Sequence, residues 1–344
     1  MRLRDVAVLS LVLCAPAAAS PTIIQFNVPG AHDTTVTGIN ATGTVTGRAI
    51  GHNIAGCSHY CGYLRTPDGS FAVFEVPGQG QTLPADINND GAVTGTYVFP
   101  GNAAEQGFVH TANGSLTTFG VADATAVEAR DINADGLIVG EAFAVSRRNI
   151  GFVRAPDGTT GTFHIGRFST TDPQDINADA FITGSCFNGD GERHGFLYQS
   201  GGPVTIFDVP GAGTHQRQGT FAQAIDHDGA VAGLFVDNRD NKHGFVRTPD
   251  GSIATFDLPH AKDMSPVSMA IVADDRMVVG TFRAKDGTHH GYMRHGDGSI
   301  EMFDAVNGTD PGTGTLDAQI GASGVIAGTS SIDGVTMRGF VRTP

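Results

Sequence analysis

Charged residues are scarce in this sequence of 344 residues, at 16%, and acidic residues outnumber basic ones by 35 to 21, which gives a net charge of −14. No run of lysine and arginine occurs, so the positive surface that neutralises nucleic-acid phosphates is missing. Past the N-terminus, no segment approaches the roughly 18 consecutive apolar residues of a membrane-spanning helix. The sequence therefore predicts neither a nucleic-acid partner nor membrane insertion.

Local catalytic signatures are missing as well. The chain has no Gly-x-Ser-x-Gly elbow, no His-Glu-x-x-His helix, no phosphate-binding glycine-rich loop and no Cys-x-x-Cys pair. These absences favour a protein without enzymatic activity. They leave open an active site assembled from single residues on separate repeats, because such a site has no local motif.

The N-terminal segment has the pattern of a secretory signal peptide. A basic start, Met1–Asp5, precedes an apolar run, Val6–Leu13, and a stretch of small residues that ends at Ser20. The apolar run is too short to span a bilayer. We expect residues 1–20 to be removed, and residues 21–344 to form one domain that is secreted or periplasmic and monomeric.

Glycine is abundant, at 48 residues, and it marks an internal repeat. Segments similar to Gly-Phe-Val-Arg begin at Gly62 and recur at steps of 45, 44, 44, 49, 47 and 48 residues, the last at Gly339. An aromatic residue follows each repeat glycine: Tyr63, Phe108, Phe152, Phe196, Phe245, Tyr292 and Phe340. A second aromatic closes each following run: Phe26, Phe74, Phe119, Phe163, Phe207, Phe256 and Phe303. A fixed period of this length is typical of propellers and solenoids.

Turns such as Asp90-Gly91 divide each copy into four strand-length runs, because glycine tolerates the positive φ of a hairpin turn. Four antiparallel strands per repeat are the pattern of a propeller blade. Residues 22–29 match only the fourth strand of the repeat, and the chain ends after the third. We therefore predict an all-β, seven-bladed β-propeller of four-stranded antiparallel blades, whose ring is closed by the N-terminal strand completing the last blade.

Three segments carry a family resemblance: His194-Gly-Phe, His243-Gly-Phe and His290-Gly-Tyr. Together with the Ile-Asn-x-Asp-Gly and Val-Val-Gly segments, they resemble the extracellular HAF-repeat family over the whole mature chain. The chain departs from that family in having glycine where the family name records alanine, and other residues replace the histidine in the remaining copies. The resemblance implies an exported repeat protein and no established activity.

Meander connectivity places long, varied loops on one face and short Asp-Gly turns on the other, and binding residues collect on variable loops. Six histidines are candidates for a ligand site on the loop-rich face: His194, His215, His243, His260, His289 and His290. One interpretation is a polar or metal-binding mouth over the central channel. The other is structural, because histidine before the repeat glycine belongs to the repeat pattern.

Two turn segments match the start of a calcium-binding loop, which has oxygen ligands at alternate positions and then a glycine. They are Asp86, Asn88 and Asp90 in one copy, and Asp131, Asn133 and Asp135 in the next. Neither loop continues to the bidentate carboxylate that completes a calcium loop. Hairpin turns with Asx hydrogen bonds explain the same residues, so we predict no cofactor and keep calcium as the alternative.

Three cysteines remain after removal of the signal peptide. Cys57 and Cys61 flank Ser-His-Tyr in one long loop, where an oxidising compartment favours a disulfide. With His52 and His59 nearby, a metal clip is the alternative. Cys186 lies in a predicted strand, and we expect it to be a buried free thiol.

The repeat and the missing motifs favour an exported, non-enzymatic binding or interaction propeller, with its ligand site on the loop-rich face over the channel. The ligand is a small molecule, a glycan or a protein. Two alternatives stay open: a secreted polysaccharide hydrolase or lyase on the same scaffold, and a structural cell-surface repeat protein.

Overall fold

The described part of the chain is built from β-strands. The computed structural model describes residues 21–78, 80–99, 101, 105–144, 149–187, 189–272 and 276–344, so the predicted signal peptide, residues 1–20, lies outside it. Within these ranges, no helix has the length and apolar character needed to cross a membrane. The all-β class predicted from the sequence is confirmed.

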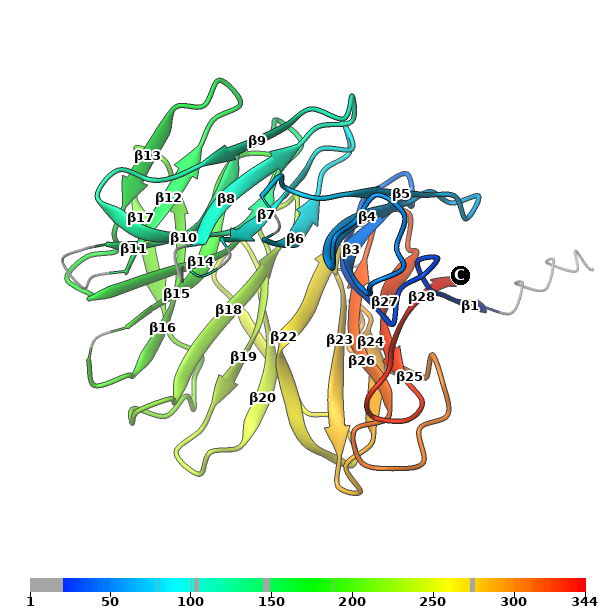
Figure 1. The fold of residues 1–344 in the computed structure, drawn as a ribbon. Coiled ribbons are helices and arrows are strands. Elements are labelled where there is room, and N and C mark those ends of the chain that lie inside the picture. The colour runs from blue at the N-terminus through cyan, green and yellow to red at the C-terminus, as the bar shows by residue number, and fades with distance from the viewer. Residues whose placement is uncertain are drawn as a thin grey trace, which may run out of the picture.

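The strands follow one another in antiparallel units of four (Figure 1). The first two units are β2 (Asp33–Ile39), β3 (Val45–Ile50), β4 (Tyr60–Arg65) and β5 (Phe71–Phe74), and β6 (Gln81–Ile87), β7 (Val93–Val98), β8 (Glu105–His110) and β9 (Leu116–Phe119). The third and fourth are β10 (Ala124–Ile132), β11 (Ile138–Ala144), β12 (Asn149–Arg154) and β13 (Thr160–Phe163), and β14 (Thr170–Ile176), β15 (Phe181–Phe187), β16 (Arg193–Gln199) and β17 (Val204–Phe207). The fifth and sixth are β18 (Gly219–Ile225), β19 (Val231–Val236), β20 (Lys242–Arg247) and β21 (Ile253–Phe256), and β22 (Ala261–Val272), β23 (Met277–Ala284), β24 (His289–Arg294) and β25 (Ile300–Phe303).

The two ends of the chain complete the last unit. Its first three strands are β26 (Gly314–Ile320), β27 (Ile326–Ser331) and β28 (Met337–Thr343), and its fourth is the N-terminal strand β1 (Thr22–Phe26). β1 runs antiparallel to β28 in the register Thr22 to Thr343 and Phe26 to Gly339. In Figure 1 the blue β1 accordingly lies beside the red end of the chain. This pairing is the one predicted for residues 22–29.

Neighbouring units meet mainly through side chains. The second strand of each unit packs against the first strand of the next, as β3 does against β6, and β27 of the last unit packs against β2 of the first. Single parallel bridges add backbone contact, such as that between Asn149 of β12 and Thr170 of β14. At the boundary between the last and first units, the Val36 N–H donates to Thr329 Oγ1 at 3.0 Å.

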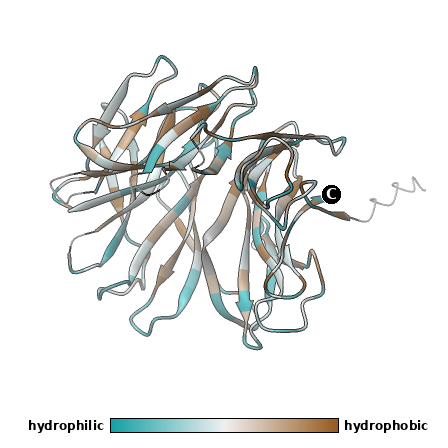
Figure 2. Cartoon of the chain, viewed as in Figure 1, coloured by the Kyte–Doolittle hydropathy of each residue, from teal (hydrophilic) through white to brown (hydrophobic). Residues whose placement is uncertain are grey.

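The two repeated aromatic positions form the core between units. The aromatic after each repeat glycine is fully buried: Tyr63, Phe108, Phe152, Phe196, Phe245, Tyr292 and Phe340. Each contacts the closing aromatic of the preceding unit, with ring centroids 5.9–6.5 Å apart, and these partners are Phe26, Phe74, Phe119, Phe163, Phe207, Phe256 and Phe303. Such edge-on and tilted pairs add to the free energy of apolar burial. Figure 2 shows the brown, apolar residues along the strands and teal at many of the loops.

Two of the repeated glycines are steric requirements. A Cβ atom on Gly151 would lie 2.5 Å from the Phe163 ring, which crosses directly over the glycine. A Cβ atom on Gly140 would lie 2.0 Å from the carbonyl oxygen of Glu128 on the adjacent first strand. Both distances are far inside van der Waals contact, so these positions accept no side chain.

A ladder of buried asparagines joins successive units where the first strands end. The side-chain amide of Asn40 donates to the Asn88 carbonyl, that of Asn88 to Asn133 and that of Asn133 to Asn177, at 3.0–3.1 Å. Asn177 in turn donates to the carbonyl of Asp226 at 3.0 Å. Each bond ties a turn of one unit to the equivalent turn of the next.

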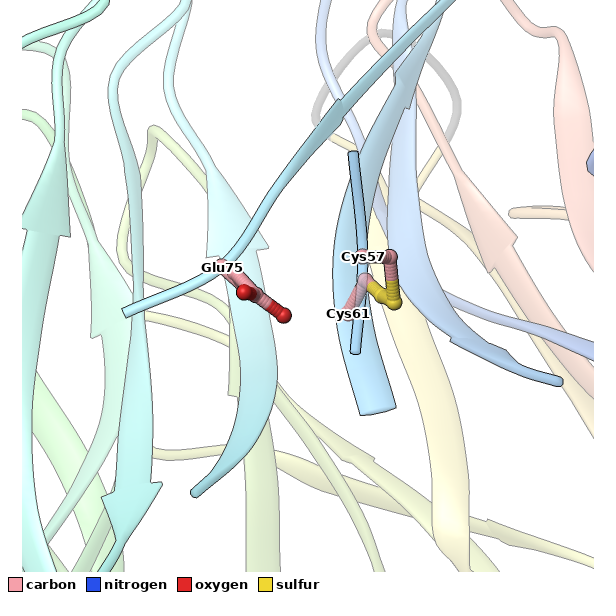
Figure 3. Close-up of side chains that lie close together, drawn as sticks. All are labelled: Cys57, Cys61 and Glu75. Carbon is pink, nitrogen blue, oxygen red and sulfur yellow. A yellow bond between two sulfur atoms is a disulfide. The ribbon is translucent and has the colours of Figure 1, made fainter. Parts of the chain in front are cut away.

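The structure describes three cysteines. Cys57, in the loop between β3 and β4, forms a disulfide with Cys61 on β4, with their Cα atoms 6.0 Å apart (Figure 3). Cys186 is a buried free thiol on β15. The buried free thiol predicted at Cys186 is confirmed.

Candidate functional site

A cavity of about 720 Å³ lies among the first strands of the units. Its lining residues come chiefly from β2, β6, β10, β14, β18, β22 and β26. The long loops precede these strands and the short turns follow them. We call the side where the first strands begin the loop-rich end of the cavity, and the side where they finish the turn end.

A recurrent β-bulge directs side chains into this cavity. In β10 the pairing register slips between Ala129 and Asp131, which leaves Arg130 without a partner on β11. A bulged residue leaves the strand's alternation, so its side chain is redirected. The bulged residues that line the cavity are Thr37, Ala85, Arg130, Gln174 and Gln223. Sequence reasoning missed them, and their one signal is that each stands two residues before the repeat isoleucine.

Charged and aromatic side chains meet at the loop-rich end. Nη1 of Arg193 lies 3.6 Å from Oδ2 of Asp172. The Arg193 guanidinium carbon also lies 4.1 Å from the ring centroid of Phe187 and 5.0 Å from that of Phe221. These aromatic contacts hold the cation in place over the cavity. On β10 of the preceding unit, Nη2 of Arg130 lies 2.6 Å from Oε2 of Glu128.

Two carboxyl groups beside these arginines bind protons more tightly than usual. Burial, together with the nearby Asp172 carboxylate, raises the pKa of Glu141 to about 7. Burial also raises the pKa of Asp172, although Arg130 and Arg193 act in the opposite direction. A carboxyl group that titrates near neutral pH is able to donate or accept a proton under ordinary conditions.

Three aspartates from successive units line the turn end. Asp131 accepts a hydrogen bond from the Ile176 N–H at 2.8 Å, and Asp175 accepts one from the Ile225 N–H at 2.7 Å. Burial, followed by the neighbouring Asp131 carboxylate, raises the pKa of both Asp86 and Asp175 well above its ordinary value. Three carboxyl groups therefore gather at this end of the cavity.

The two calcium-like segments are hairpin turns. Asn88 Oδ1 accepts hydrogen bonds from the backbone N–H groups of Asp90 and Ala92, at 3.1 and 2.9 Å, and Asn133 Oδ1 accepts one from Leu137 at 2.9 Å. Asp86 and Asp131, which precede these asparagines, line the cavity. Asp90 and Asp135, which follow them, are exposed. The candidate oxygen ligands therefore face different surroundings.

Three of the candidate histidines pair with an aspartate at one fixed repeat position. Their Nδ1 atoms lie 2.9, 2.5 and 2.8 Å from a carboxylate oxygen, in the pairs His194 with Asp208, His243 with Asp257 and His290 with Asp304. In each pair the aspartate directly follows the closing aromatic of the unit. Each imidazole also packs on a phenylalanine: Phe168, Phe235 and Phe282. The three histidines therefore share one environment, which their repeat position sets.

The other three candidate histidines lie apart. His215 and His260 are exposed on loops, whereas His289 begins β24 opposite Gly314. Within the described ranges, the group of His, Cys, Asp or Glu side chains close enough to share a metal ion is Cys57, Cys61 and Glu75. It contains no histidine, so the six candidates do not gather at one metal site.

Asp226 stands in the asparagine ladder where the preceding units have asparagine. Its Oδ1 accepts the Ala230 N–H at 2.7 Å, while its buried Oδ2 has no hydrogen-bond partner among the described residues. Burial raises the pKa of this carboxyl group. The Asp226 carboxylate therefore destabilises the fold increasingly as the pH rises above about 4, the ordinary pKa of aspartate.

We expect Asp226→Asn to raise the free energy of unfolding at pH 7 by about 1 kcal/mol, because an amide supplies the missing donor without a charge. The gain should shrink near pH 4, where the wild-type carboxyl group is already protonated in the folded protein. Urea unfolding at both pH values measures the difference. An equal gain at both, or a loss at pH 7, would contradict this reading of the ladder.

No family model matches the chain, and no curated protein matches it by sequence. Among solved structures it is similar to a prolyl endopeptidase, with a TM-score of 0.59 and 12% identity over 92% of this chain and 51% of that one. It is also similar to a puromycin hydrolase, with a TM-score of 0.57 and 12% identity over 88% of this chain and 51% of that one. The BP39L lectin from Burkholderia pseudomallei matches with a TM-score of 0.51 and 9% identity over 90% of this chain and 96% of that one. This chain has a propeller-like fold. It spans about half the length of the endopeptidase and of the hydrolase, and likeness at this identity shows the fold alone.

Proposed function

We propose that the units form a closed ring of seven propeller blades. The aromatic contact between successive units continues across the chain ends, because Phe26 on β1 packs against Tyr63 of the first unit. One cavity also reaches the first strand of every unit, from β2 to β26, which is expected if those strands encircle it. Ring closure protects sheet edges that an open array would expose.

We propose that the protein is an exported binding protein whose ligand enters the cavity from the loop-rich end. The observation that carries this proposal is the polar lining of the cavity. Oγ1 of Thr37 and Oε1 of Gln223, two of the bulged residues, are buried and have no hydrogen-bond partner within the described structure. Buried polar groups are nearly always satisfied, so we infer that these two side chains turn toward a ligand in the cavity and bond to it.

The charge of the lining favours a ligand without negative charge. Two arginines line the cavity, Arg130 and Arg193, against five aspartates: Asp86, Asp131, Asp172, Asp175 and Asp317. Burial raises the pKa of Asp86, Asp172 and Asp175, so the lining becomes more acidic as the pH rises, and an acidic cavity attracts cations and disfavours anions. We propose a neutral or cationic ligand rich in hydroxyl, amide or amine groups. Export rests on the signal-peptide pattern of residues 1–20 and on the resemblance to the HAF-repeat family.

The test replaces a cavity side chain whose amide oxygen has no hydrogen-bond partner within the described structure. Mature protein, residues 21–344, is screened on a glycan array and, by thermal shift, against sugars, polyols, amino acids and polyamines. We expect Gln223→Leu to weaken binding of any hit by about tenfold or more, because the hydrogen bond from the ligand is lost. The matched control is Gln199→Leu, since the Gln199 amide bonds to Asp179 in an exposed turn outside the cavity.

Binding that survives Gln223→Leu unchanged would place the ligand elsewhere. Failure of every compound class to bind would favour the alternative of a structural surface protein.

A second candidate function is hydrolysis of a polysaccharide. The observation that favours it is the pair of buried carboxyl groups beside the arginines, since Glu141 has a pKa of about 7 and is suited to general acid catalysis. Release of reducing ends from a polysaccharide panel by the wild type, and its loss in Glu141→Gln, would establish this function over simple binding.

A further inference from the structure

Three potential metal ligands lie together outside the cavity: Cys57 in the loop between β3 and β4, Cys61 on β4 and Glu75 directly after β5. The sulfur atoms of Cys57 and Cys61 and a carboxylate oxygen of Glu75 all lie within 4.8 Å of one another. Figure 3 shows the Glu75 carboxylate directed toward the two sulfur atoms from the segment that follows β5. Thiolate and carboxylate groups are ordinary zinc ligands.

The repeat explains why these positions meet. Cys61 stands directly before a repeat glycine, and Glu75 directly follows the closing aromatic of the unit. In the fourth, fifth and sixth units the same two positions hold the histidine–aspartate pairs, which are in contact at 2.5–2.9 Å. The fold thus brings these positions within reach in several units, and the first unit places a sulfur atom and a carboxylate there.

A neighbouring side chain orients the carboxylate. Ser58 donates to Oε2 of Glu75 from its backbone N–H at 2.8 Å and from its hydroxyl at 2.9 Å. Such second-layer hydrogen bonds commonly fix a metal-binding carboxylate. The imidazoles of His52 and His59 stack in the same loop with centroids 4.4 Å apart.

We propose that Cys57 and Cys61, when reduced, bind one zinc ion together with Glu75. A dithiol reductant transfers two electrons and two protons to the disulfide, giving two thiols and leaving the reductant as its own disulfide. Zinc binding then displaces the two thiol protons, and water or an imidazole completes the tetrahedral coordination. The disulfide and the zinc complex are alternative states of one site at the loop-rich end.

The experiment compares oxidised and reduced mature protein without changing its sequence. Protein reduced with dithiothreitol and freed of it under nitrogen is titrated with ZnCl₂ by calorimetry, and with CoCl₂ by absorption spectroscopy. We expect the reduced protein to bind one more zinc ion per chain than the oxidised protein. Its cobalt complex should show sulfur-to-metal charge-transfer absorption that the oxidised protein lacks. Equal zinc stoichiometry in both forms would overturn the proposal.

Two variants assign the ligands. Glu75→Gln should bind zinc at least about tenfold more weakly in the reduced form, and Cys186→Ser, which removes the buried free thiol on β15, should bind as the wild type does. Loss of the extra zinc ion in Cys186→Ser, or unchanged affinity in Glu75→Gln, would contradict the three-ligand site. Both substitutions leave Cys57 and Cys61 intact, so the disulfide form remains the reference state.

Discussion

Replacing Gly140 with alanine is expected to lower the free energy of unfolding by about 3 kcal/mol or more, or to prevent folding. The new Cβ atom would lie 2.0 Å from the Glu128 carbonyl oxygen, 3.0 Å from the Ala129 Cα and 2.8 Å from the Phe152 ring. Two of these neighbours are backbone atoms at the bulge of β10. They can withdraw only if β10 separates from β11, which breaks the ladder that directs Arg130 into the cavity.

The matched control for this substitution is Gly161→Ala in the same unit. Gly161 lies in β13, and a Cβ atom there would meet nothing within 4 Å. We expect its free energy of unfolding to change by no more than about 0.5 kcal/mol. Urea denaturation of both variants, followed by far-ultraviolet circular dichroism, measures the difference. Similar stability of the two variants would show that the close approach at Gly140 does not constrain the fold.

Asn133→Ala is expected to lower the free energy of unfolding by about 2–3 kcal/mol. Asn133 is buried, accepts the Leu137 N–H at 2.9 Å and donates to the Asn177 carbonyl at 3.0 Å. Alanine removes the amide bond to the Asn177 carbonyl, which keeps only the Ala180 N–H at 3.1 Å, and it removes the Asx bond of the turn at the same time. The loss therefore affects two units at once, and thermal unfolding should remain a single transition at a lower temperature.

Asn113→Ala is the control for the ladder. Asn113 makes the same kind of turn, accepting the Ser115 N–H at 2.9 Å, but it is exposed and lies in the turn between β8 and β9. We expect Asn113→Ala to lower the free energy of unfolding by no more than about 1 kcal/mol, since water takes the place of the exposed hydrogen bond. A loss equal to that of Asn133→Ala would mean that the turn, and not the contact between units, is what the asparagine stabilises.

Much of the fold follows from spacing along the chain. The recurrence of Gly151 and Phe163 with their equivalents predicts four strands per unit, and Thr22–Phe26 matches a fourth strand that pairs with β28. These inferences succeed because strand pairing within a unit is local. Hairpin turns of a few residues set the register before any distant segment is involved.

The candidate site was only partly predictable. The sequence directs attention to histidines such as His243, but the structure pairs that residue with Asp257 at the edge of its own unit. It also turns Gln223 and Arg130, which the sequence does not distinguish, into the cavity. A bulge reverses which face a strand residue occupies, and a pattern of alternating residues does not reveal where the bulge lies.

The sequence therefore determines the all-β class, the four-stranded unit and the pairing of the chain ends, because each depends on short-range spacing or on a repeated position. Only the tertiary structure decides which side chains share the cavity. Asp86, Asp131 and Asp175 come from three different units. The hydrogen bonds that Asp131 and Asp175 accept from Ile176 and Ile225 depend on how neighbouring first strands lie against each other. Proximity between units is a property of side-chain packing, which residue spacing along one strand does not encode.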